Sequence, residues 1–228
     1  FLGGKPISCI SAVTYDKNFG FIGLYIVKPE FRGKGHGYQI WKRALSYLGN
    51  RNIGLDGVLA QQFNYKKSGF KLAYRNIRYR GFANQLMQSD PTFKGDTLQG
   101  QLARISKVAF QDLEEYDRQL FSVPRSRFLK CWISQPGSVG LARVEGSRVV
   151  GYGVIRPCRT GYKIGPLFAD NFKIANSLFR SLIETAKPNS GVFLDVPEIN
   201  STAIKLVRKY HMTKVFETAR MYTQAPPT

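Results

Sequence analysis

The stretch Val27-Lys28-Pro29-Glu30-Phe31-Arg32-Gly33-Lys34-Gly35-His36-Gly37-Tyr38 is the most informative part of this sequence. It follows an apolar run at residues 21–27, typical of a buried strand, and precedes residues 38–48, whose apolar positions recur at helical spacing. Glycines in such a turn let the backbone approach an anion, and the N-terminus of the helix adds a favourable dipole. Arg32 and Lys34 add positive charge at the same place. The stretch therefore predicts a site for an anionic cofactor.

Two other phosphate-binding loops fit this stretch less well. A Walker loop needs a terminal Lys-Ser/Thr pair, which the stretch does not supply. A dinucleotide fingerprint needs Gly-x-Gly-x-x-Gly; Gly33 and Gly35 fit it, but Tyr38 stands where the third glycine belongs. Asp56 follows near the position of a ribose-binding acid, so a dinucleotide site remains an alternative. A glycine-rich turn without any ligand is the third interpretation.

Residues 27–37 read Val-x-Pro-x-x-Arg-Gly-x-Gly-x-Gly, which resembles the acetyl-CoA-binding signature of the GNAT superfamily of N-acyltransferases. A second motif, Tyr65-x-x-x-Gly69-Phe70, is similar to one on a short helix of that family. The predicted elements also follow the family order: an antiparallel strand pair, a cofactor helix, a strand, a short helix and a last strand, at residues 7–15, 21–27, 38–48, 53–58, 65–70 and 74–79. Since a whole GNAT unit begins earlier, the resemblance implies that the N-terminal half of this first unit is missing from the chain.

The second half of the sequence repeats the same pattern in full. We expect strands at residues 105–110, 140–144, 149–156, 161–168, 192–196 and 213–222, and helices at residues 111–121, 125–134, 171–186 and 201–210. Leu194-Asp195 corresponds to Leu55-Asp56, and residues 212–220 parallel residues 70–78 with the same spacing. The second copy has lost the glycine turn, and Asp170 or Asn171 is the expected N-cap of its helix.

These features predict an α/β fold of mixed α+β type, with two tandem GNAT-like units. Each unit would hold a mixed, mostly antiparallel sheet flanked by helices. We expect the acetyl-CoA-binding unit at residues 1–81, an exposed linker at residues 82–103 that is rich in Gly, Gln, Asp and Ser, and a degenerate second unit at residues 104–228. The second unit is expected to bind no CoA.

The resemblance implies an N-acetyltransferase that transfers an acetyl group from acetyl-CoA to a primary amine by direct attack in a ternary complex. The main chain of Tyr25, Ile26 and Val27 would hold the pantetheine and polarise the thioester. The diphosphate would lie against Arg32, Gly33, Lys34, Gly35, His36, Gly37 and Tyr38. Tyr65 is the candidate general acid for the leaving thiolate.

The general base is less well defined, because residues 21–27 lack the glutamate that many relatives carry there. Asp56 could act through water or bind a cationic acceptor, but an Asp-Gly pair is also common in turns. Gln61 and Gln62 are candidate acceptor-binding residues. The acceptor could be a small molecule or a peptide, and the sequence does not define the oligomeric state.

The strongly positive charge of the sequence allows other functions besides acetyl transfer. The net charge is +19, with 14 Lys/Arg against 3 Asp/Glu in residues 1–81 and 20 against 12 in residues 82–228. A positive field aids capture of CoA. The competing functions are a dinucleotide-binding oxidoreductase and a basic, non-catalytic protein that binds nucleic acid or another anion, although no nucleic-acid motif is evident. Three scattered cysteines and two histidines predict no metal site, with Cys9 and Cys158 as buried thiols, and the chain is expected to be cytoplasmic with no membrane partner.

Overall fold

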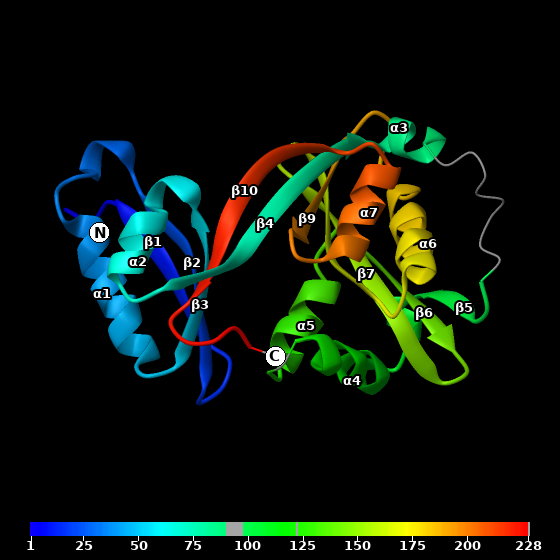
Figure 1. Ribbon diagram of the computed structural model, residues 1–228, viewed down its shortest axis with the longest axis horizontal. Coiled ribbons are helices and arrows are strands. Elements are labelled where there is room, and N and C mark those ends of the chain that lie inside the picture. Colours follow the sequence, from blue (N-terminus) through cyan, green and yellow to red (C-terminus); the bar gives the residue numbers. More distant parts are fainter. Residues whose placement is uncertain (90–97, 122, 228) are drawn as a thin grey trace. The chain divides into compact units, whose positions relative to one another are not determined.

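The protein is described by a computed structural model that covers residues 1–89, 98–121 and 123–227 (Figure 1). The chain divides into two compact units, one made of Phe1–Arg75 with Thr218–Thr228 and the other of Asn76–Glu217. Each unit contains a mixed sheet with helices packed on it, so the predicted fold class is confirmed. In the described part of the chain, no helix is both long enough and apolar enough to cross a membrane.

The first unit has the strand order β1-β2-β3-β10. β1 (Ser8–Thr14) pairs antiparallel with β2 (Phe19–Val27), and β2 pairs parallel with β3 (Asn52–Val58). The remaining elements are η1 (Pro29–Phe31), α1 (His36–Leu48), η2 (Leu59–Gln61), α2 (Gln62–Lys67) and the end of β10 (Thr213–Tyr222). Residues 218–222 of β10 pair antiparallel with β3 and complete the sheet.

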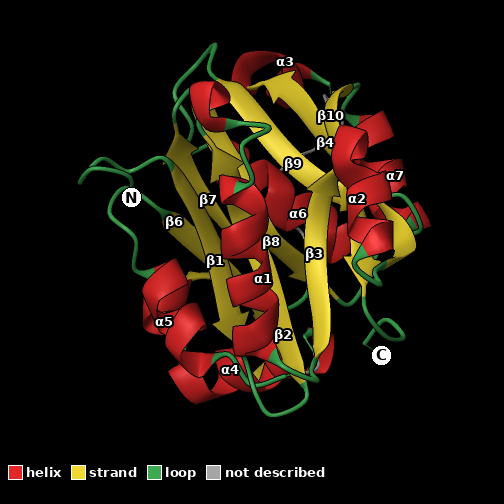
Figure 2. Cartoon of the chain, turned by 90° about the vertical axis from the view of Figure 1, so that its left-hand side faces the viewer, coloured by secondary structure: helices red, strands yellow, loops and turns green. Residues whose placement is uncertain are grey.

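Helix α1 forms because its apolar residues recur every three or four positions. Trp41, Ala44 and Leu48 are buried, and they pack with β2, β3 and the end of β10 into one core. The helix begins after Gly35 and ends at Gly49, and both glycines have a positive φ that other residues rarely adopt. Figure 2 shows α1 lying across β1 and β2.

The second unit has the strand order β4-β9-β8-β7-β6-β5, and only β8 and β9 pair parallel. Its strands are the end of β4 (Lys71–Phe82), β5 (Gln101–Arg104), β6 (Val139–Glu145), β7 (Arg148–Cys158), β8 (Gly161–Ala169) and β9 (Gly191–Pro197). Its helices are α3 (Ala83–Gln88), η3 (Ile105–Lys107), α4 (Phe110–Leu120), α5 (Ser126–Ile133), α6 (Phe172–Ile183) and α7 (Ser201–Lys209). Apolar side chains of β7 contribute to two cores: Val150 packs with α6 and α7, whereas Val149 and Tyr152 pack with α4 and α5.

The last strand of each unit comes from the other half of the sequence. The strand expected at residues 74–79 of the first unit continues as β4, whose residues 76–82 pair with β9 in the second unit. The strand expected at residues 213–222 of the second unit is β10, whose residues 218–222 pair with β3 in the first unit. The chain therefore passes from one unit to the other within β4 and again within β10.

Several local predictions differ from the structure. The strand expected at residues 105–110 lies earlier in the chain, as β5, and residues 105–110 instead hold η3 and the first residue of α4. Part of the expected exposed linker, residues 82–103, is α3, whose Ala83 and Leu86 are buried in the core of the second unit; residues 90–97 lie outside the described part. Cys9 is exposed, because it lies on the face of β1 opposite to Ile10, which packs toward α1, and Cys158 is half-buried.

Candidate functional site

The glycine turn joins β2 to α1 and leaves backbone N–H groups available at its centre. Gly33 and Gly35 have φ values of +74° and +80°, and a Cβ added at either position would meet no atom within 4 Å. The first helical hydrogen bond of α1 runs from the N–H of Gln39 to the carbonyl of Gly35 at 3.1 Å, so the N–H groups of residues 36–38 precede the first carbonyl partner of the helix. No acidic residue lies in the first turn of α1. An anion can therefore approach this helix end without meeting a negative side chain.

The side chains of the turn lie at the surface. Arg32 Nε donates to the carbonyl of Val27 at 3.0 Å, which ties the turn to the end of β2. Lys34 Nζ lies 5.7 Å from the centre of the Phe31 ring, and the ring of His36 meets that of Phe31 edge-on at 6.2 Å. These contacts place two fixed cations beside the available N–H groups.

The third glycine of the motif also has a packing role. A Cβ on Gly37 would lie 2.8 Å from the Tyr25 hydroxyl oxygen and 2.9 Å from Val27 Cγ2. Any side chain at this position would push the first turn of α1 away from β2. Gly37 therefore fixes the distance between the turn and the strand that carries three of the predicted cofactor-binding residues.

β2 and β3 part at the centre of the first unit. Their parallel pairing runs from Phe19 with Asn52 to Ile22 with Leu55, and then stops. At the same level β2 is irregular: its pairing with β1 shifts register between Cys9 and Ser11, and Leu24 has a φ of +50°. The backbone groups of β2 beyond Ile22 are thus turned out of the ladder with β3.

A cleft of about 200 Å³ occupies this opening. Four of the predicted site residues line it: Tyr25, Ile26, Asp56 and Tyr65. The complete lining is Ile22, Gly23, Leu24, Tyr25, Ile26, Trp41, Leu55, Asp56, Gly57, Val58 and Tyr65. Sequence reasoning missed Leu24 as a site residue, because a positive φ at a leucine has no sequence signal, and it treated Trp41 only as a core position of the helix.

Tyr65 reaches the cleft from α2. Its side chain is buried, with its ring centre 5.5 Å from that of Trp41. A Cβ on Gly57 would lie 2.3 Å from Tyr65 Cε2, so the glycine in β3 makes the room for this ring. Burial, and to a lesser degree the neighbouring Tyr25, raise the pKa of the Tyr65 phenol above its ordinary value. The hydroxyl therefore keeps its proton at neutral pH and can donate it.

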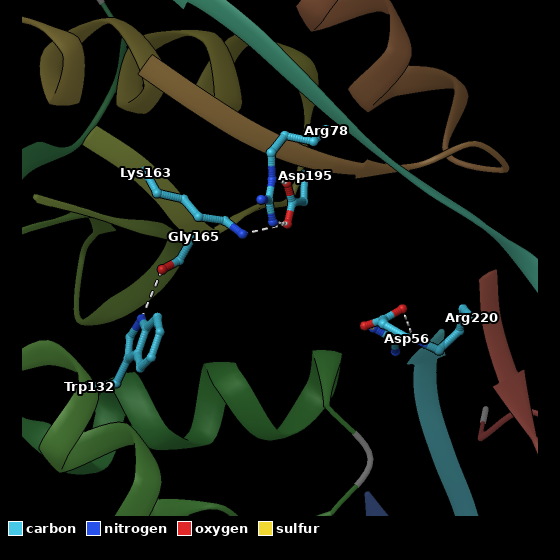
Figure 3. A network of polar contacts seen from close by, with 7 residues as sticks. All are labelled: Asp56, Arg78, Trp132, Lys163, Gly165, Asp195 and Arg220. Atoms are coloured by element: carbon cyan, nitrogen blue, oxygen red, sulfur yellow. Dashed lines mark hydrogen bonds and ion pairs between the residues drawn. The ribbon is translucent and has the colours of Figure 1, made fainter. Parts of the chain in front are cut away.

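Asp56 lies in β3 rather than in an Asp-Gly turn, and it is paired with a cation (Figure 3). Arg220 on β10 stands opposite it in the sheet and donates from Nε and Nη2 to its two carboxylate oxygens at 2.8 and 2.7 Å. The guanidinium also lies 5.2 Å from the centre of the Phe21 ring. Burial alone lowers the pKa of Arg220, but the hydrogen bonds and charge of Asp56 outweigh it and raise that pKa, so the guanidinium remains charged.

Gln61 and Gln62 lie at the junction of η2 and α2, and neither lines the cleft. The Gln61 side-chain oxygen accepts a hydrogen bond from Asn64 Nδ2 at 2.7 Å. The Gln62 side-chain oxygen accepts one from Arg75 Nη1 at 2.8 Å. Both side chains thus hold local structure at the start of the short helix.

The second unit has the same opening between β8 and β9, but its own side chains bridge it. The parallel pairing stops after Ile164 and Leu194, which correspond to Ile22 and Leu55. Beyond that point Asp195 accepts from Arg78 Nε and Nη2 at 2.7 and 2.9 Å and also pairs with Lys163 (Figure 3). Burial raises the pKa of Asp195, but the two cations outweigh this and lower it. Trp132 Nε1 donates to the carbonyl of Gly165 at 2.8 Å.

No glycine turn precedes α6 of the second unit. The Asn171 side chain instead accepts from the N–H of Ile174 at 3.0 Å, as expected for an N-cap. Asp170 accepts a hydrogen bond from the Tyr116 hydroxyl at 2.9 Å. The N–H of Ile174 in the first turn of α6 is thus bonded within the protein, and the carboxylate of Asp170 stands just before the helix.

Comparison with known proteins identifies both halves of the chain. Residues 113–228 match the model of the acetyltransferase (GNAT) domain, and residues 1–70 match that of the acetyltransferase (GNAT) family. The chain is 30% identical over 227 residues to the holothin acyltransferase of Pseudoalteromonas sp. (strain SANK 73390), covering 100% of this chain and 74% of that protein. It is 26% identical over 197 residues to the uncharacterized N-acetyltransferase YitH of Bacillus subtilis (strain 168), covering 86% of this chain and 66% of that protein.

Solved structures share the fold at low sequence identity. A proposed acetyltransferase from Pyrococcus horikoshii superposes with a TM-score of 0.80 at 24% identity, over 99% of this chain and 72% of that one. A tandem GNAT protein from the clavulanic acid biosynthesis pathway superposes with a TM-score of 0.71 at 11% identity, over 99% of this chain and 81% of that one. The tandem arrangement predicted from the repeat thus occurs in a protein with a similar fold.

Proposed function

Because this chain belongs to the GNAT family of acetyltransferases, and is therefore an acyltransferase, we propose that it transfers an acetyl group from acetyl-CoA to a primary amine in a ternary complex. The observation that carries the proposal is the position of the glycine turn. It lies at the end of β2, the strand that also forms one wall of the cleft. A single extended ligand with a diphosphate at one end and a thioester at the other matches this arrangement.

The residues of the first unit fit acetyl-CoA in two places. The diphosphate would bind the N–H groups at the start of α1, in the open space next to Gly33 and Gly35, with Arg32 and Lys34 balancing its charge. The pantetheine would lie along Tyr25, Ile26 and Val27, whose backbone is turned out of the ladder with β3. A backbone N–H near the irregularity at Leu24 would then polarise the thioester carbonyl.

Acyl transfer requires few groups of the protein. The amine nitrogen attacks the thioester carbon, the new C–N bond forms, and the C–S bond breaks. The nitrogen loses one proton to water, and the leaving thiolate takes one proton from a donor. We assign that donor role to Tyr65, because its buried phenol lines the cleft and keeps its proton.

Asp56 is less suited to be the direct base. Both of its carboxylate oxygens accept hydrogen bonds from Arg220, and protonating it would leave that guanidinium without its counter-charge. We therefore propose that the amine proton leaves through water and that Asp56 acts on the reaction only through the charge of the pair. Family membership also favours neither of the competing functions, the dinucleotide-dependent oxidoreductase and the non-catalytic anion-binding protein.

The test is a substitution that closes the glycine turn. Gly35→Val places a branched side chain at a φ of +80° in the open space that the diphosphate would use. We expect the affinity for acetyl-CoA, measured by calorimetry, to fall at least tenfold, which corresponds to about 1.4 kcal/mol.

Gly146→Val is the matched control, because Gly146 also has a positive φ of +61° with no atom within 4 Å of an added Cβ, but lies in the second unit. It should leave the affinity for acetyl-CoA unchanged. Equal affinity in both variants, or stabilisation of the parent protein by NAD but not by CoA, would contradict the proposal.

A further inference from the structure

The wall of the cleft is mainly apolar. Leu24, Ile26 and Val58 line it while keeping 72%, 54% and 43% of their surface exposed. Tyr25 and Tyr65 add aromatic surface, and burial raises the pKa of both phenols, so they remain neutral. A ligand group that enters here meets hydrocarbon and aromatic rings rather than charges.

The acids that this chain contributes to the first unit lie outside the cleft or are neutralised. The unit holds 13 Lys/Arg and three Asp/Glu residues. Asp16 accepts from the backbone N–H groups of Asn18 and Phe19, and Glu30 is part of η1, outside the cleft. Among the residues that line the cleft, all of which the structure describes, Asp56 is the only acid, and Arg220 holds both of its oxygens.

This arrangement disfavours a cationic acceptor. An ammonium group would lose hydration on entering an apolar cleft, and the carboxylate there already has a cation as its partner. The surrounding positive charge would oppose its approach as well. An aliphatic amine with a pKa near 10.4 is neutral in only about one molecule in 2,500 at pH 7, so its attack would also need a base.

We propose that the natural acceptor is an apolar amine that is already uncharged at neutral pH, such as an aromatic or other weakly basic, conjugated amine. This inference rests on the proposed acetyltransferase function. The lone pair of a neutral amine attacks the thioester without prior loss of a proton. The nitrogen gives up its proton to water only as the C–N bond forms and the C–S bond breaks, and Tyr65 protonates the thiolate. With the pantetheine along β2, a flat acceptor can lie against the side chains that line the cleft from β3 and α2, Val58 and Tyr65.

The experiment compares amines of matched shape. We would measure release of the CoA thiol with saturating acetyl-CoA, using a panel of aromatic amines that includes 4-methylaniline and a panel of aliphatic amines that includes benzylamine and spermidine. At pH 7 we expect kcat/KM for 4-methylaniline to exceed that for benzylamine at least tenfold. Between pH 6 and pH 8 the benzylamine rate should rise about tenfold per pH unit, because its neutral fraction rises so, whereas the 4-methylaniline rate should stay flat.

Preference for the aliphatic panel, or turnover of neither panel, would overturn the inference. These outcomes remain distinct from failure of the proposed function, because binding of acetyl-CoA is measured separately by calorimetry. If acetyl-CoA binds and cationic amines are preferred, only the choice of acceptor is wrong. If acetyl-CoA does not bind, the acetyltransferase assignment of the site is wrong.

A second variant tests the role of the ion pair. Arg220→Gln removes the charged partner of Asp56 and should raise the ratio of kcat/KM for benzylamine to that for 4-methylaniline at least threefold. The ratio does not depend on the fraction of folded protein. Arg78→Gln is the matched control, since it breaks the corresponding pair with Asp195 in the second unit and should leave the ratio unchanged. An unchanged ratio in the Arg220 variant would contradict the assignment of Asp56 as a neutralised acid.

Discussion

A single added methyl group at Gly57, a residue of the cleft lining, should disturb the reaction by displacing the Tyr65 ring. Gly57 lies in β3, and its position determines how closely the Tyr65 ring can pack against that strand. A Cβ there would lie 2.3 Å from Tyr65 Cε2 and 2.6 Å from Tyr65 Cδ2. Gly57→Ala therefore forces the Tyr65 ring, and with it the hydroxyl, to move.

The size of the effect follows from this geometry. The overlap is about 1 Å relative to ordinary van der Waals contact, so the ring must move by roughly that amount. Overpacking of this kind costs typically 1–3 kcal/mol of stability, and a misplacement of about 1 Å at a reacting group can cost about 100-fold in rate. We expect kcat to fall by one to two orders of magnitude, while the affinity for acetyl-CoA changes little because the glycine turn is intact.

The assay is steady-state kinetics together with calorimetric binding of acetyl-CoA. Gly165→Ala is the control, because Gly165 lies in β8 of the second unit and an added Cβ there meets no atom within 4 Å. The decisive comparison is made in a Tyr65→Phe background. If Gly57→Ala acts by displacing the proton donor, it should lower kcat far less once the hydroxyl is gone. The same loss in both backgrounds would refute this role of Tyr65.

Two further predictions concern stability and domain organisation. Arg125 Nη2 lies 2.6 Å from an Asp117 oxygen, and only 11% and 4% of the Arg125 and Asp117 side chains are exposed. Asp117→Asn removes the charge partner of this buried arginine, so it should lower the free energy of unfolding by about 3 kcal/mol and the melting temperature by roughly 10 °C. Arg148→Gln breaks an exposed pair with Asp170 and should lower the free energy of unfolding by less than about 1 kcal/mol. An equal effect of the two substitutions in thermal melts would contradict the burial argument. Deleting residues 218–228 removes the buried Ala219 and Met221 from the core of the first unit, so the shortened chain should lose its thermal stabilisation by acetyl-CoA although residues 27–70 are intact. Full retention of that stabilisation would show that the first unit does not need β10.

The local structure around the candidate site could be predicted from the sequence, because its signals are local. Glycines with positive φ, an apolar stripe at helical spacing and the Tyr-x-x-x-Gly-Phe motif each involve residues close together in the chain. The repeat also matched Arg78 with Arg220 by spacing alone, and these two arginines hold the equivalent pairs with Asp195 and Asp56. The sequence did not indicate that Leu24 and Trp41 line the cleft, because the irregularity at Leu24 and the packing of α1 against β2 depend on contacts between distant parts of the chain.

Composition was a poor guide to the linker. Residues 82–103 contain many polar and small residues, which predicted an exposed connector. Leu86 is nevertheless fully buried, and a Cβ on Gly81 would lie 2.4 Å from its Cδ2. The apolar face of α3, Ala83 with Leu86, thus packs into the core although the composition of residues 82–103 is polar on average.

The choice of partner for the last strand of each unit could not be read from the sequence, because residues 70–78 and 212–220 carry the same pattern. Either segment satisfies the local rules beside either fifth strand, since each would offer one arginine opposite one aspartate. The structure pairs Arg220 with Asp56, 164 residues away, and Arg78 with Asp195, 117 residues away. The local chemistry of the two pairs is equivalent, so the ion pairs do not decide which segment joins which unit. It follows that duplicated halves can exchange a strand without losing an ion pair, and that the first unit, in which we propose the acyl-transfer site, is completed only when the last residues of the chain are in place.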